Sequence, residues 1–427
     1  MKAVILVAGE GTRLHPLTLT RPKHLIPVGE KTVIEHVLGT VRDAGFNEAI
    51  IVVHYRAEQL KQFLGNGSKY GIGIEYVHQA EMKGTADAIR TVESYVNEDF
   101  LLIYGDLLTT PEIIKKVVES HEKNKPAVSM AVVQVEHPEH YGIVRLEGDY
   151  IVDILEKPKP GEAPTNLANA GIYVFSKEIF EKIRQTTLSP RGELELPDAL
   201  KLLIKEKRRI LAVQISAKDW FDIGRPWDLL EANMWALSRM APTVKGIIED
   251  NVHLIGVVSV AEGARIRSGA YVEGPTFIGE DSDIGPNCYI RPYTHIGKKT
   301  HIGNACEIKN SIIMDETKIG HLAYVGDSVI GEGCNFGAGT VIANYRFDAK
   351  SVKMMVKDEV VDSGRTKLGV FLGDSVKTGI NATLMPGVKV GNNSWIGAGM
   401  VVYRDVPANT RVVLKQEIEQ QKLDEGS

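Results

Sequence analysis

Apolar residues recur at every sixth position through much of the second half of the chain. One unbroken series consists of Ile266, Val272, Ile278, Ile284, Ile290, Ile296, Ile302 and Ile308. A second series consists of Leu372, Leu384, Val390, Ile396 and Val402, with Thr378 at the position between its first two members. Glycine follows many of these residues, and this pattern is the hexapeptide repeat of a parallel β-helix. We therefore expect residues 252–405 to form a left-handed parallel β-helix.

The repeat is interrupted once before it ends. The period breaks in residues 346–368, which carry several charges, so we interpret this segment as an arm that leaves the coil. Residues 406–427 are expected to form a tail, with a short helix over residues 415–422. Each of the three cysteines lies two residues before an apolar repeat position, where small side chains are otherwise found. We therefore expect the cysteines to pack inside the coil and to form neither disulfides nor a zinc site.

The first half of the chain has a different pattern, in which short apolar runs alternate with amphipathic segments. This alternation predicts an α/β domain built on a doubly wound sheet, with ligands at the carboxyl ends of its strands. We assign residues 1–228 to this domain and residues 229–251 to a helical linker. Strands are expected at residues 3–7, 49–54, 72–77 and 100–104, and helices at residues 33–44, 58–64 and 84–92.

A glycine loop follows the first expected strand. Gly9 and Gly11 leave backbone amides that can face a phosphate, and Arg13 and Lys23 place two cations just beyond them. The loop lacks the third glycine of the dinucleotide-binding fingerprint, and no Gly-Lys-Ser/Thr closes it as in a P-loop. The pattern therefore indicates a phosphate-binding site of another kind.

Further polar residues follow the other expected strands. Asp106 and Asp222 each end an apolar or strand-like segment, where an aspartate either caps a helix or binds a metal ion. Gln79 precedes Lys83-Gly-Thr-Ala86, and its amide offers one donor and one acceptor to the edge of a pyrimidine base. A simple surface turn is the alternative interpretation of the Gln79 segment.

Gly-x-Gly-Thr-Arg-Leu, followed by Pro-Leu-Thr and Arg-Pro-Lys, resembles the signature of the sugar-1-phosphate nucleotidylyltransferases. This resemblance implies that Arg13 and Lys23 are catalytic and that Asp106 and Asp222 hold Mg²⁺. It also implies that the sugar phosphate is bound by Gly142, Glu156, Lys157 and Asn169. The nucleotide, UTP or dTTP, would then contact Leu6, Val7, Ala8, Gly9, Gly11, Thr12, Gln79, Gly84, Thr85, Tyr104 and Gly105.

Within the repeat region, the segments around His321, Asn335 and Asn344 resemble the acetyltransferase half of the bifunctional bacterial enzymes that make UDP-N-acetylglucosamine. The resemblance implies that His321 is the general base. It assigns the sugar phosphate of this second site to Arg291, Lys309, Tyr324, Asn335 and Lys350, and acetyl-CoA to Ala338, Asn344, Tyr345, Ala398 and Lys415. The chain departs from the bacterial pattern at Asp374, where that family has a serine for coenzyme A, and in its longer arm.

The chain as a whole most resembles the archaeal version of the bifunctional protein. That resemblance implies N-acetylation of glucosamine-1-phosphate, uridylyl transfer to N-acetylglucosamine-1-phosphate, and a homotrimer. A net charge of −5 argues against nucleic-acid binding, and no apolar stretch approaches the roughly 20 residues of a membrane span, so we expect a cytoplasmic protein.

Two alternatives remain open at this stage. One is a glucose-1-phosphate thymidylyltransferase or mannose-1-phosphate guanylyltransferase that uses the β-helix only as a trimerisation stalk. The other is a non-catalytic regulatory subunit of the translation initiation exchange factor type. Joint retention of Arg13, Lys23, Asp106, Lys157 and Asp222 argues against the regulatory subunit, because a scaffold needs none of them.

Overall fold

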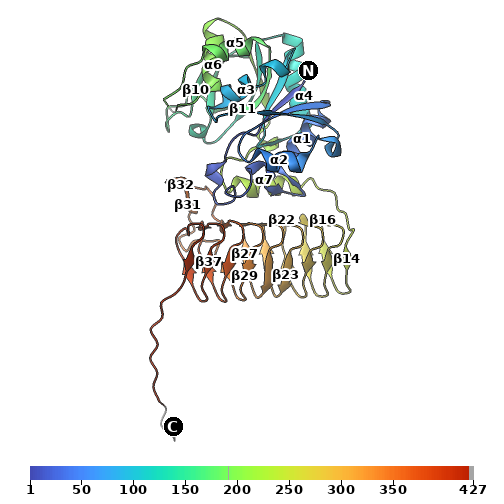
Figure 1. Cartoon of the computed structure of the whole chain (residues 1–427), viewed down its shortest axis with the longest axis vertical. Helices are drawn as coiled ribbons and strands as arrows, with labels where there is room; N and C mark the ends of the chain where they lie inside the picture. Colours follow the sequence, from blue (N-terminus) through green and yellow to red (C-terminus); the bar gives the residue numbers. More distant parts are fainter. Residues whose placement is uncertain (191, 423–427) are drawn as a thin grey trace. The chain divides into compact units, whose positions relative to one another are not determined.

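The computed structural model describes residues 1–190 and 192–422, and the chain divides into two compact units (Figure 1). The first unit consists of residues 1–14 and 20–232, and the second of residues 15–19 and the chain from Asn233 onward. None of the helices in the described part of the chain combines the length and apolarity that a bilayer crossing requires.

A mixed β-sheet forms the centre of the first unit, with the strand order β5-β4-β1-β6-β11-β8-β12-β10-β9. Strands β5, β4, β1 and β6 are parallel, whereas β11 runs antiparallel to both of its main neighbours. The strands are Ala3–Leu6 (β1), Glu48–Val53 (β4), Gly73–His78 (β5), Phe100–Tyr104 (β6), Val128–Gln134 (β8), Gly142–Glu147 (β9), Tyr150–Glu156 (β10), Leu167–Phe175 (β11) and Ile210–Ile215 (β12). The expected α/β domain on a doubly wound sheet is therefore confirmed.

Helices cover both faces of this sheet. Alternate residues of β1 point to opposite faces, so Ala3 and Ile5 join one buried cluster and Val4 joins the other. The first cluster also contains apolar side chains from α1, α2 and α4, and the second contains side chains from α3, α5 and α6. The helices are Val33–Asp43 (α1), Ala57–Leu64 (α2), Thr85–Arg90 (α3), Pro111–Asn124 (α4), Glu178–Gln185 (α5), Leu196–Lys205 (α6) and Asp228–Leu237 (α7).

A short antiparallel ladder lies beside the main sheet. Strand β7 (Leu107–Thr109) pairs with β13 (Trp220–Asp222), and Asp222 is the partner of Leu107. Because Asp106 immediately precedes β7, this register brings Asp106 and Asp222 together from distant parts of the sequence. A smaller pair, β2 (Pro27–Val28) and β3 (Lys31–Thr32), leads into α1, where Thr32 and Glu35 form a capping box.

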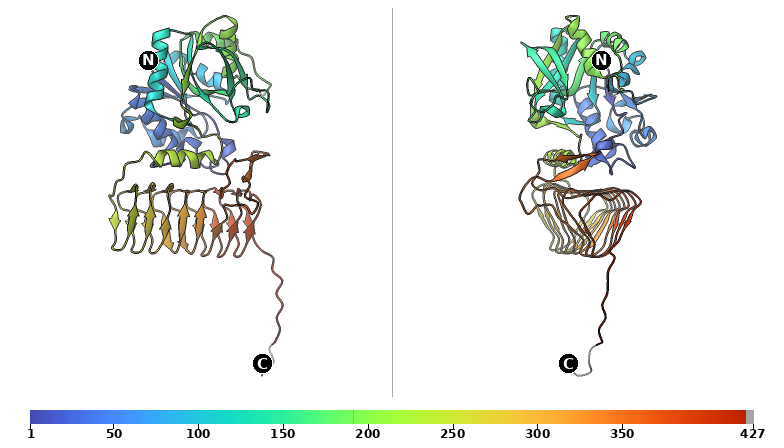
Figure 2. Two further views of the ribbon diagram at one scale, coloured as in Figure 1. Left: turned by 180° about the vertical axis from the view of Figure 1, so that it is seen from behind. Right: turned by 90° about the vertical axis from the view of Figure 1, so that its left-hand side faces the viewer.

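The second unit is a parallel β-helix (Figure 2), as the hexapeptide period predicts. Its short strands stack into three parallel sheets, and the inward residue of each strand enters one continuous apolar core that includes the three cysteines. The first sheet contains β14 (Ile247–Ile248), β17 (Arg265–Ile266), β20 (Asp283–Ile284), β23 (His301–Asn304), β26 (Lys318–His321), β29 (Asn335–Phe336), β34 (Lys377–Thr378), β37 (Trp395–Ile396) and β39 (Arg411–Val412). The coils thus extend beyond the expected residues 252–405 at both ends.

The other two sheets of the β-helix run alongside the first. The second contains β15 (His253–Ile255), β18 (Tyr271–Glu273), β21 (Tyr289–Ile290), β24 (Glu307–Lys309), β27 (Tyr324–Gly326), β30 (Val341–Ile342), β35 (Thr383–Leu384) and β38 (Val401–Val402). The third contains β16 (Val258–Val260), β19 (Thr276–Ile278), β22 (Thr294–Ile296), β25 (Ile312–Ile313), β28 (Val329–Ile330), β33 (Phe371–Leu372) and β36 (Lys389–Val390).

The arm contains an antiparallel hairpin of β31 (Lys353–Val356) and β32 (Glu359–Asp362). It leaves after β30 and returns before β33, and β33 still pairs directly with β28. The helix expected over residues 415–422 is wrong, because this segment has no regular secondary structure. Its single large apolar residue, Ile418, is exposed, and so short a helix without a packing surface is unstable in water. Residues 423–427 lie outside the described residues.

Two stacked glycines provide a test of the coil-to-coil packing. A Cβ on Gly303 would overlap the carbonyl oxygen of Gly320 in the next coil, whereas a Cβ on Gly320 would meet nothing within 4 Å. We predict that Gly303→Ala destabilises the β-helix by about 1–3 kcal/mol, the usual cost of overpacking, because the backbone of a coil must shift. Gly320→Ala is the matched control and should leave the denaturant midpoint of the β-helix transition nearly unchanged. Equal midpoints for the two variants would contradict the stacking described here.

Candidate active sites

The glycine loop and the ends of the neighbouring strands form the first site. The backbone N–H of Val7 donates to Val52 at 2.9 Å, and that of Gly105 donates to Leu6 at 2.9 Å, so these strand ends are held together. Gly11 has a φ of 72°, which a residue with a side chain rarely adopts. A Cβ on Gly9 would meet nothing within 4 Å, so the loop presents open backbone. This arrangement suits a phosphate group.

Lys23, Asp106 and Asp222 form the charged centre of the first site. The Lys23 ammonium bonds directly to the carboxylate of Asp106. Burial raises the pKa of Asp106, but the charge of Lys23 and further contacts outweigh it, so the net shift is downward. Burial and then the charge of Asp106 raise the pKa of Asp222 to about 6. Two buried carboxylates therefore lie close together, and the nearby cations offset the repulsion between their negative charges only in part.

A divalent cation fits this carboxylate pair. Mg²⁺ is usually held by one or two carboxylates together with substrate phosphates, rather than by a complete protein cage. The described residues contain no group of three or more His, Cys, Asp or Glu side chains arranged around a possible metal position. Arg13 is exposed beside this pair, and its charge lowers the pKa of Asp222.

Asp228 supports the loop that follows Asp222. Its carboxylate accepts hydrogen bonds from the backbone N–H groups of Gly224 at 3.0 Å and Arg225 at 2.6 Å. Burial and the charge of Asp222 raise the pKa of Asp228 to about 7. Asp228 therefore orders the turn between β13 and α7.

Gln79 lies at the end of β5, and its side chain is buried. Its amide nitrogen donates to Asp87 at 2.8 Å and to the carbonyl of Gly84 at 3.3 Å. Asp87 also accepts from Arg90 at 2.5 Å, so this carboxylate fixes which end of the amide is the donor. Sequence reasoning missed Asp87, and its position on the first turn of α3 was the available signal.

Gly84 and Thr85, which the resemblance assigns to the nucleotide, both contact the chain segment that leads into α6. A Cβ on Gly84 would lie 2.5 Å from the carbonyl oxygen of Leu194, so a neighbouring chain segment fills that space. The hydroxyl of Thr85 accepts a hydrogen bond from the backbone N–H of Leu196 at 3.1 Å. Both residues thus hold the start of α6 against α3 in this structure. Tyr104, by contrast, is at the end of β6, with its hydroxyl 3.4 Å from that of Tyr173.

The residues expected to bind the sugar phosphate lie together. Gly142 pairs with Glu156 across β9 and β10, and a carboxylate oxygen of Glu156 lies 2.7 Å from where a Cβ on Gly142 would be. Asn169 approaches the same position from β11, and its amide donates to Tyr173 at 2.5 Å. The ammonium of Lys157 is 3.7 Å from Glu156. The strand pairing therefore brings these polar groups to one place.

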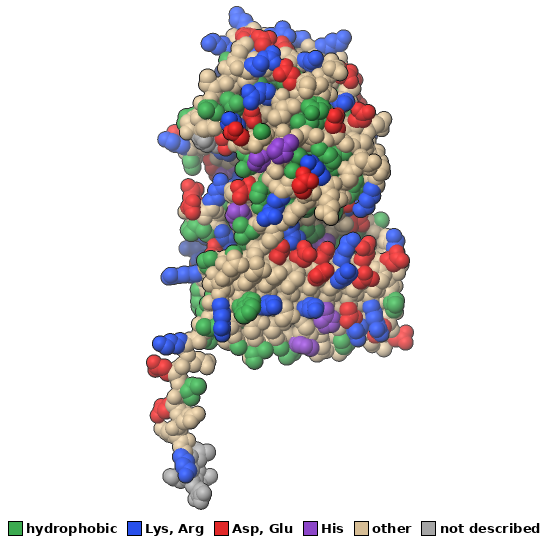
Figure 3. Space-filling model, in the orientation of Figure 1, with side chains coloured by type: hydrophobic (Ala, Val, Ile, Leu, Met, Phe, Trp, Pro, Cys, Tyr) green, Lys and Arg blue, Asp and Glu red, His purple; other side chains and the backbone are tan. Residues whose placement is uncertain are grey.

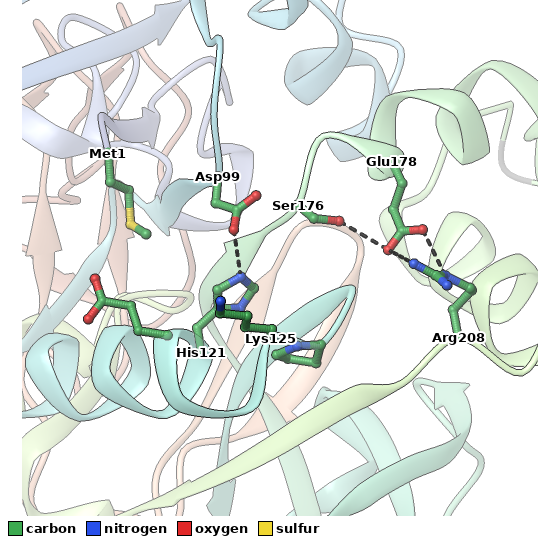
Figure 4. A pocket seen from close by; sticks show the side chains of 9 residues that line it. Met1, Asp99, His121, Lys125, Ser176, Glu178 and Arg208 are labelled. Atoms are coloured by element: carbon green, nitrogen blue, oxygen red, sulfur yellow. Dashed lines mark hydrogen bonds and ion pairs between the residues drawn. The ribbon is translucent and has the colours of Figure 1, made fainter.

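A cavity of about 670 Å³ opens at the opposite edge of the sheet (Figure 4). Met1, Asp99 and Pro126 line it, and they precede β1, β6 and β8. His121 points into it, with Nε2 3.2 Å from Asp99, while Arg208 bonds to Glu178 across its other side. Since ligands of such sheets bind at the carboxyl ends of the strands, this cavity is separate from the first site.

A column of corner residues on the β-helix forms the second site. Lys318, Asn335, Lys377 and Trp395 stack in register on successive coils. Three residues further along each coil, the column continues as His321, Ala338, Ile380 and Ala398. The backbone hydrogen bonds Gly339 to His321 (3.3 Å), Asn381 to Ala338 (2.8 Å) and Gly399 to Ile380 (2.8 Å) follow the same register. The structure thus aligns the expected base with both alanines expected to contact acetyl-CoA.

The cations expected near His321 lie on the adjacent sheet. Arg291 and Lys309 occupy equivalent positions on successive coils, since Ile290 pairs with Ile308. Arg291 bonds to Glu307 at 2.8 Å, and Lys309 bonds to Asp327 at 3.0 Å. Both cations are therefore held in place by carboxylates. Figure 3 shows Lys and Arg side chains interspersed with Asp and Glu side chains on one face of the molecule.

Tyr324 and Asn344 meet beside Lys309. The amide of Asn344 donates to the Tyr324 hydroxyl at 3.1 Å. Tyr345 immediately precedes the arm and Lys350 lies in it, and both are exposed. Lys415 lies after β39, in a segment without regular secondary structure. Asp374 accepts a hydrogen bond from the N–H of Glu332 at 2.9 Å and closes a corner of the coil.

Family models match most of the chain. A model of the nucleotidyl transferase family matches residues 2–239. A model described as the GMPPB C-terminal domain matches residues 272–369, and one for the hexapeptide repeat of succinyl-transferase matches residues 369–404. The two parts of the sequence therefore match different kinds of model.

Several known proteins are similar to this chain over nearly their full length. The bifunctional protein GlmU of Methanocaldococcus jannaschii is 45% identical over 424 residues, which cover 99% of this chain and 100% of the relative. A bifunctional sugar-1-phosphate nucleotidylyltransferase/acetyltransferase of Sulfurisphaera tokodaii is 43% identical over 95% of this chain and 98% of its own. A solved UDP-glucose pyrophosphorylase, complexed with UDP-glucose, matches 56% of this chain with a TM-score of 0.51 and 29% identity.

The buried His24 beside Lys23 gives a prediction about pH. Burial and the charge of Lys23 lower the pKa of His24 to about 3, so the folded first unit keeps this imidazole neutral. An unfolded histidine takes up a proton near pH 6.5, so stability is present above that pH and is lost as pH falls. At pH 5 the loss attributable to His24 should be roughly 2 kcal/mol.

Hydrogen exchange of β1 and β6 amides, compared at pH 7 and pH 5, measures this loss. His24→Gln should show a weaker pH dependence than the unmodified chain. His137→Gln, which alters an exposed histidine of the same unit, should retain the original dependence. Identical profiles for His24→Gln and the unmodified chain would contradict the assignment.

Proposed function

This chain belongs to the family of bifunctional sugar-1-phosphate nucleotidylyltransferase/acetyltransferases, and we propose that its substrates are those of UDP-N-acetylglucosamine synthesis. The β-helix would transfer the acetyl group of acetyl-CoA to glucosamine-1-phosphate. The first unit would transfer the uridylyl group of UTP to N-acetylglucosamine-1-phosphate and release pyrophosphate. The observation that supports both activities is that each unit carries its own cluster of polar groups suited to one of them.

Nucleotidyl transfer needs positioning and charge neutralisation. A phosphate oxygen of the sugar phosphate attacks the α-phosphorus of the triphosphate, and the bond to the leaving pyrophosphate breaks. Because the nucleophile is already an anion, no general base is required. We assign the pyrophosphate to Arg13 and Lys23, and the incoming phosphate to Lys157. Mg²⁺, held by Asp106 and Asp222, would neutralise negative charge on the phosphates.

The orientation of Gln79 supports a uracil or thymine base. Because its amide nitrogen already donates to Asp87, the side-chain oxygen remains as the group suited to accept a hydrogen bond. The ring N3–H of uracil and thymine is such a donor, whereas the N3 of cytosine is an acceptor. Uracil and thymine share this N3–H, and we propose UTP because of the resemblance to the enzymes that make UDP-N-acetylglucosamine.

Acetyl transfer requires a free amine. The amine nitrogen of glucosamine-1-phosphate attacks the thioester carbonyl, the carbon–sulfur bond breaks, and coenzyme A leaves as the thiolate. His321 would accept the proton that the amine loses, because an imidazole is matched to proton transfer near neutral pH. Arg291 and Lys309 would hold the sugar phosphate, and Tyr324 and Asn335 would orient the sugar. We also propose that the chain acts as a homotrimer in the cytoplasm.

Asp374 favours one narrower alternative. In place of the serine that the bacterial family uses for coenzyme A, this chain has a carboxylate that closes a coil corner. A chain limited to nucleotidyl transfer, with glucose-1-phosphate or mannose-1-phosphate as substrate and the β-helix as a stalk, is consistent with that departure. An assay of acetyl transfer distinguishes the two possibilities.

Asp222→Asn should abolish most nucleotidyl transfer and leave acetyl transfer unchanged, because it removes one of the two carboxylates assigned to Mg²⁺. Release of pyrophosphate and of free coenzyme A, measured on one preparation across a Mg²⁺ series, tests this expectation. Asp219→Asn, at the adjacent turn, is the matched control and should retain both activities. Near-normal turnover of Asp222→Asn at limiting Mg²⁺ would show that the metal assignment is wrong.

His321→Ala should lower acetyl transfer by roughly 10²–10⁴-fold, the usual effect of removing a positioned general base. Nucleotidyl transfer should be unchanged, because His321 belongs to the other unit. His301→Ala is the control, since His301 pairs with Lys318 on the same sheet, three residues before the corner. Acetyl transfer at the original rate in His321→Ala would contradict the assignment of His321 as the general base. If the unmodified chain showed no acetyl transfer, the alternative in which the β-helix is only a trimerisation stalk would be favoured.

A further inference from the structure

We propose that Asp327 is a positioning residue that joins the two substrate subsites of the acetyl-transfer site. It would hold Lys309 on the sugar-phosphate side and Asn344 on the acetyl-CoA side with a single carboxylate oxygen. This inference rests on the proposed acetyl transfer, and Asp327 would act through Lys309 and Asn344 rather than on a substrate directly.

The carboxylate of Asp327 lies at the centre of a buried polar cluster. One oxygen accepts from the ammonium of Lys309 at 3.0 Å and from the amide of Asn344 at 2.5 Å. The other oxygen accepts from the amide of Asn310 at 2.7 Å. Asp327 is only 2% exposed, so protein groups take the place of water around its charge. A buried carboxylate satisfied in this way is held firmly in one orientation.

The partners of Asp327 come from different turns of the β-helix. Lys309 and Asn310 belong to the preceding coil, whereas Asn344 follows β30 on the next coil. Asn344 in turn donates to the Tyr324 hydroxyl at 3.1 Å. The single carboxylate therefore connects a cation, an amide and, through that amide, a phenol that the proposed function assigns to substrates.

Gly326 makes room for this cluster. A Cβ at Gly326 would lie 2.5 Å from the Tyr324 hydroxyl and 2.7 Å from the Asn344 amide nitrogen. The position stacks directly on Lys309 in the neighbouring coil. Gly326 thus leaves space for the side chains of Tyr324 and Asn344, and Asp327 binds the Asn344 amide. A coil corner without this polar cluster would need neither residue.

The base of the arm forms backbone hydrogen bonds with Asn344 and Asp327. The N–H of Leu368 donates to the carbonyl of Asn344 at 2.9 Å, and the N–H of Gly369 donates to the carbonyl of Asp327 at 2.8 Å. The arm therefore leaves directly after one member of the cluster and returns against another. Reorienting Asn344 would also disturb the start of the arm, where Tyr345 is assigned to acetyl-CoA.

The consequence is thermodynamic coupling between the subsites. Lys309 and Asn344 share one acceptor, so a change in the position of either alters the bond of the other. If Asp327 only stabilised the fold, its removal would change stability without a matched change in both Michaelis constants. Kinetics with both substrates therefore distinguish positioning from a purely structural role.

The experiment compares the full-length chain with Asp327→Asn, which keeps the shape but replaces one acceptor oxygen with a donor. We expect the KM values for glucosamine-1-phosphate and for acetyl-CoA each to rise by about tenfold or more, the scale of losing a charge-assisted hydrogen bond. Nucleotidyl transfer should be unchanged. Asp283→Asn is the matched control, because it breaks the Arg267 ion pair (2.6 and 2.8 Å) on another sheet of the β-helix and should leave both constants unchanged.

Each outcome decides a separate question. Absence of acetyl transfer in the unmodified chain would remove the proposed function itself. Acetyl transfer with unchanged KM values in Asp327→Asn would overturn the positioning role. If Asp327→Asn unfolds the β-helix, Lys309→Met decides: a rise in both KM values supports the shared carboxylate, and a rise for glucosamine-1-phosphate alone overturns it.

Discussion

Backbone hydrogen bonding between successive coils is the constraint on which the second unit depends. Each short strand contributes few contacts of its own, but its N–H and C=O groups pair with the coils on both sides, and its inward apolar residue extends one core. Neighbouring coils are therefore held at the strand spacing of about 4.8 Å. Residues in different repeats, such as His321 and Ala338, thus become neighbours through the backbone hydrogen bonds between coils.

In the first unit, an electrostatic constraint has a comparable role. The three-residue pairing of β7 with β13 forces Asp106 and Asp222 together at a poorly hydrated sheet edge. Repulsion between like charges is costly there, and Lys23 relieves only part of it. A domain that needed only stability would place apolar or singly charged residues at this edge, so the arrangement is characteristic of a site for cations and phosphates.

Some parts of the structure could be predicted from the sequence and others could not, for physical reasons. A repeat of six residues is visible in sequence because every coil buries its inward side chain, so the β-helix and the buried cysteines could be predicted. The adjacency of Asp106 and Asp222 could only be implied by resemblance, since strands as short as β7 and β13 have no pattern of their own. Asp327 was overlooked because Gly-Asp at a corner looks like any turn, and its partners depend on the register across the arm. The expected helix at residues 415–422 was wrong because so short a segment has only one large apolar residue, Ile418, and that residue is exposed rather than packed.

The members of the corner column of the β-helix lie at different distances from the last coil. In a quasi-one-dimensional array, cooperative units open first at the terminal repeats, because these have only one neighbour. Ala398 follows β37, beyond which only β39 is stacked on that sheet in the described residues, whereas His321 is followed by several further coils. If the final coils unfolded, the end of the column at Ala398 would lose its structure, while the coils around His321 would remain folded. Opening of the coils around Ala398 would then have a lower free energy than unfolding of the whole β-helix, so one end of the column could be lost while the rest of the unit stays folded.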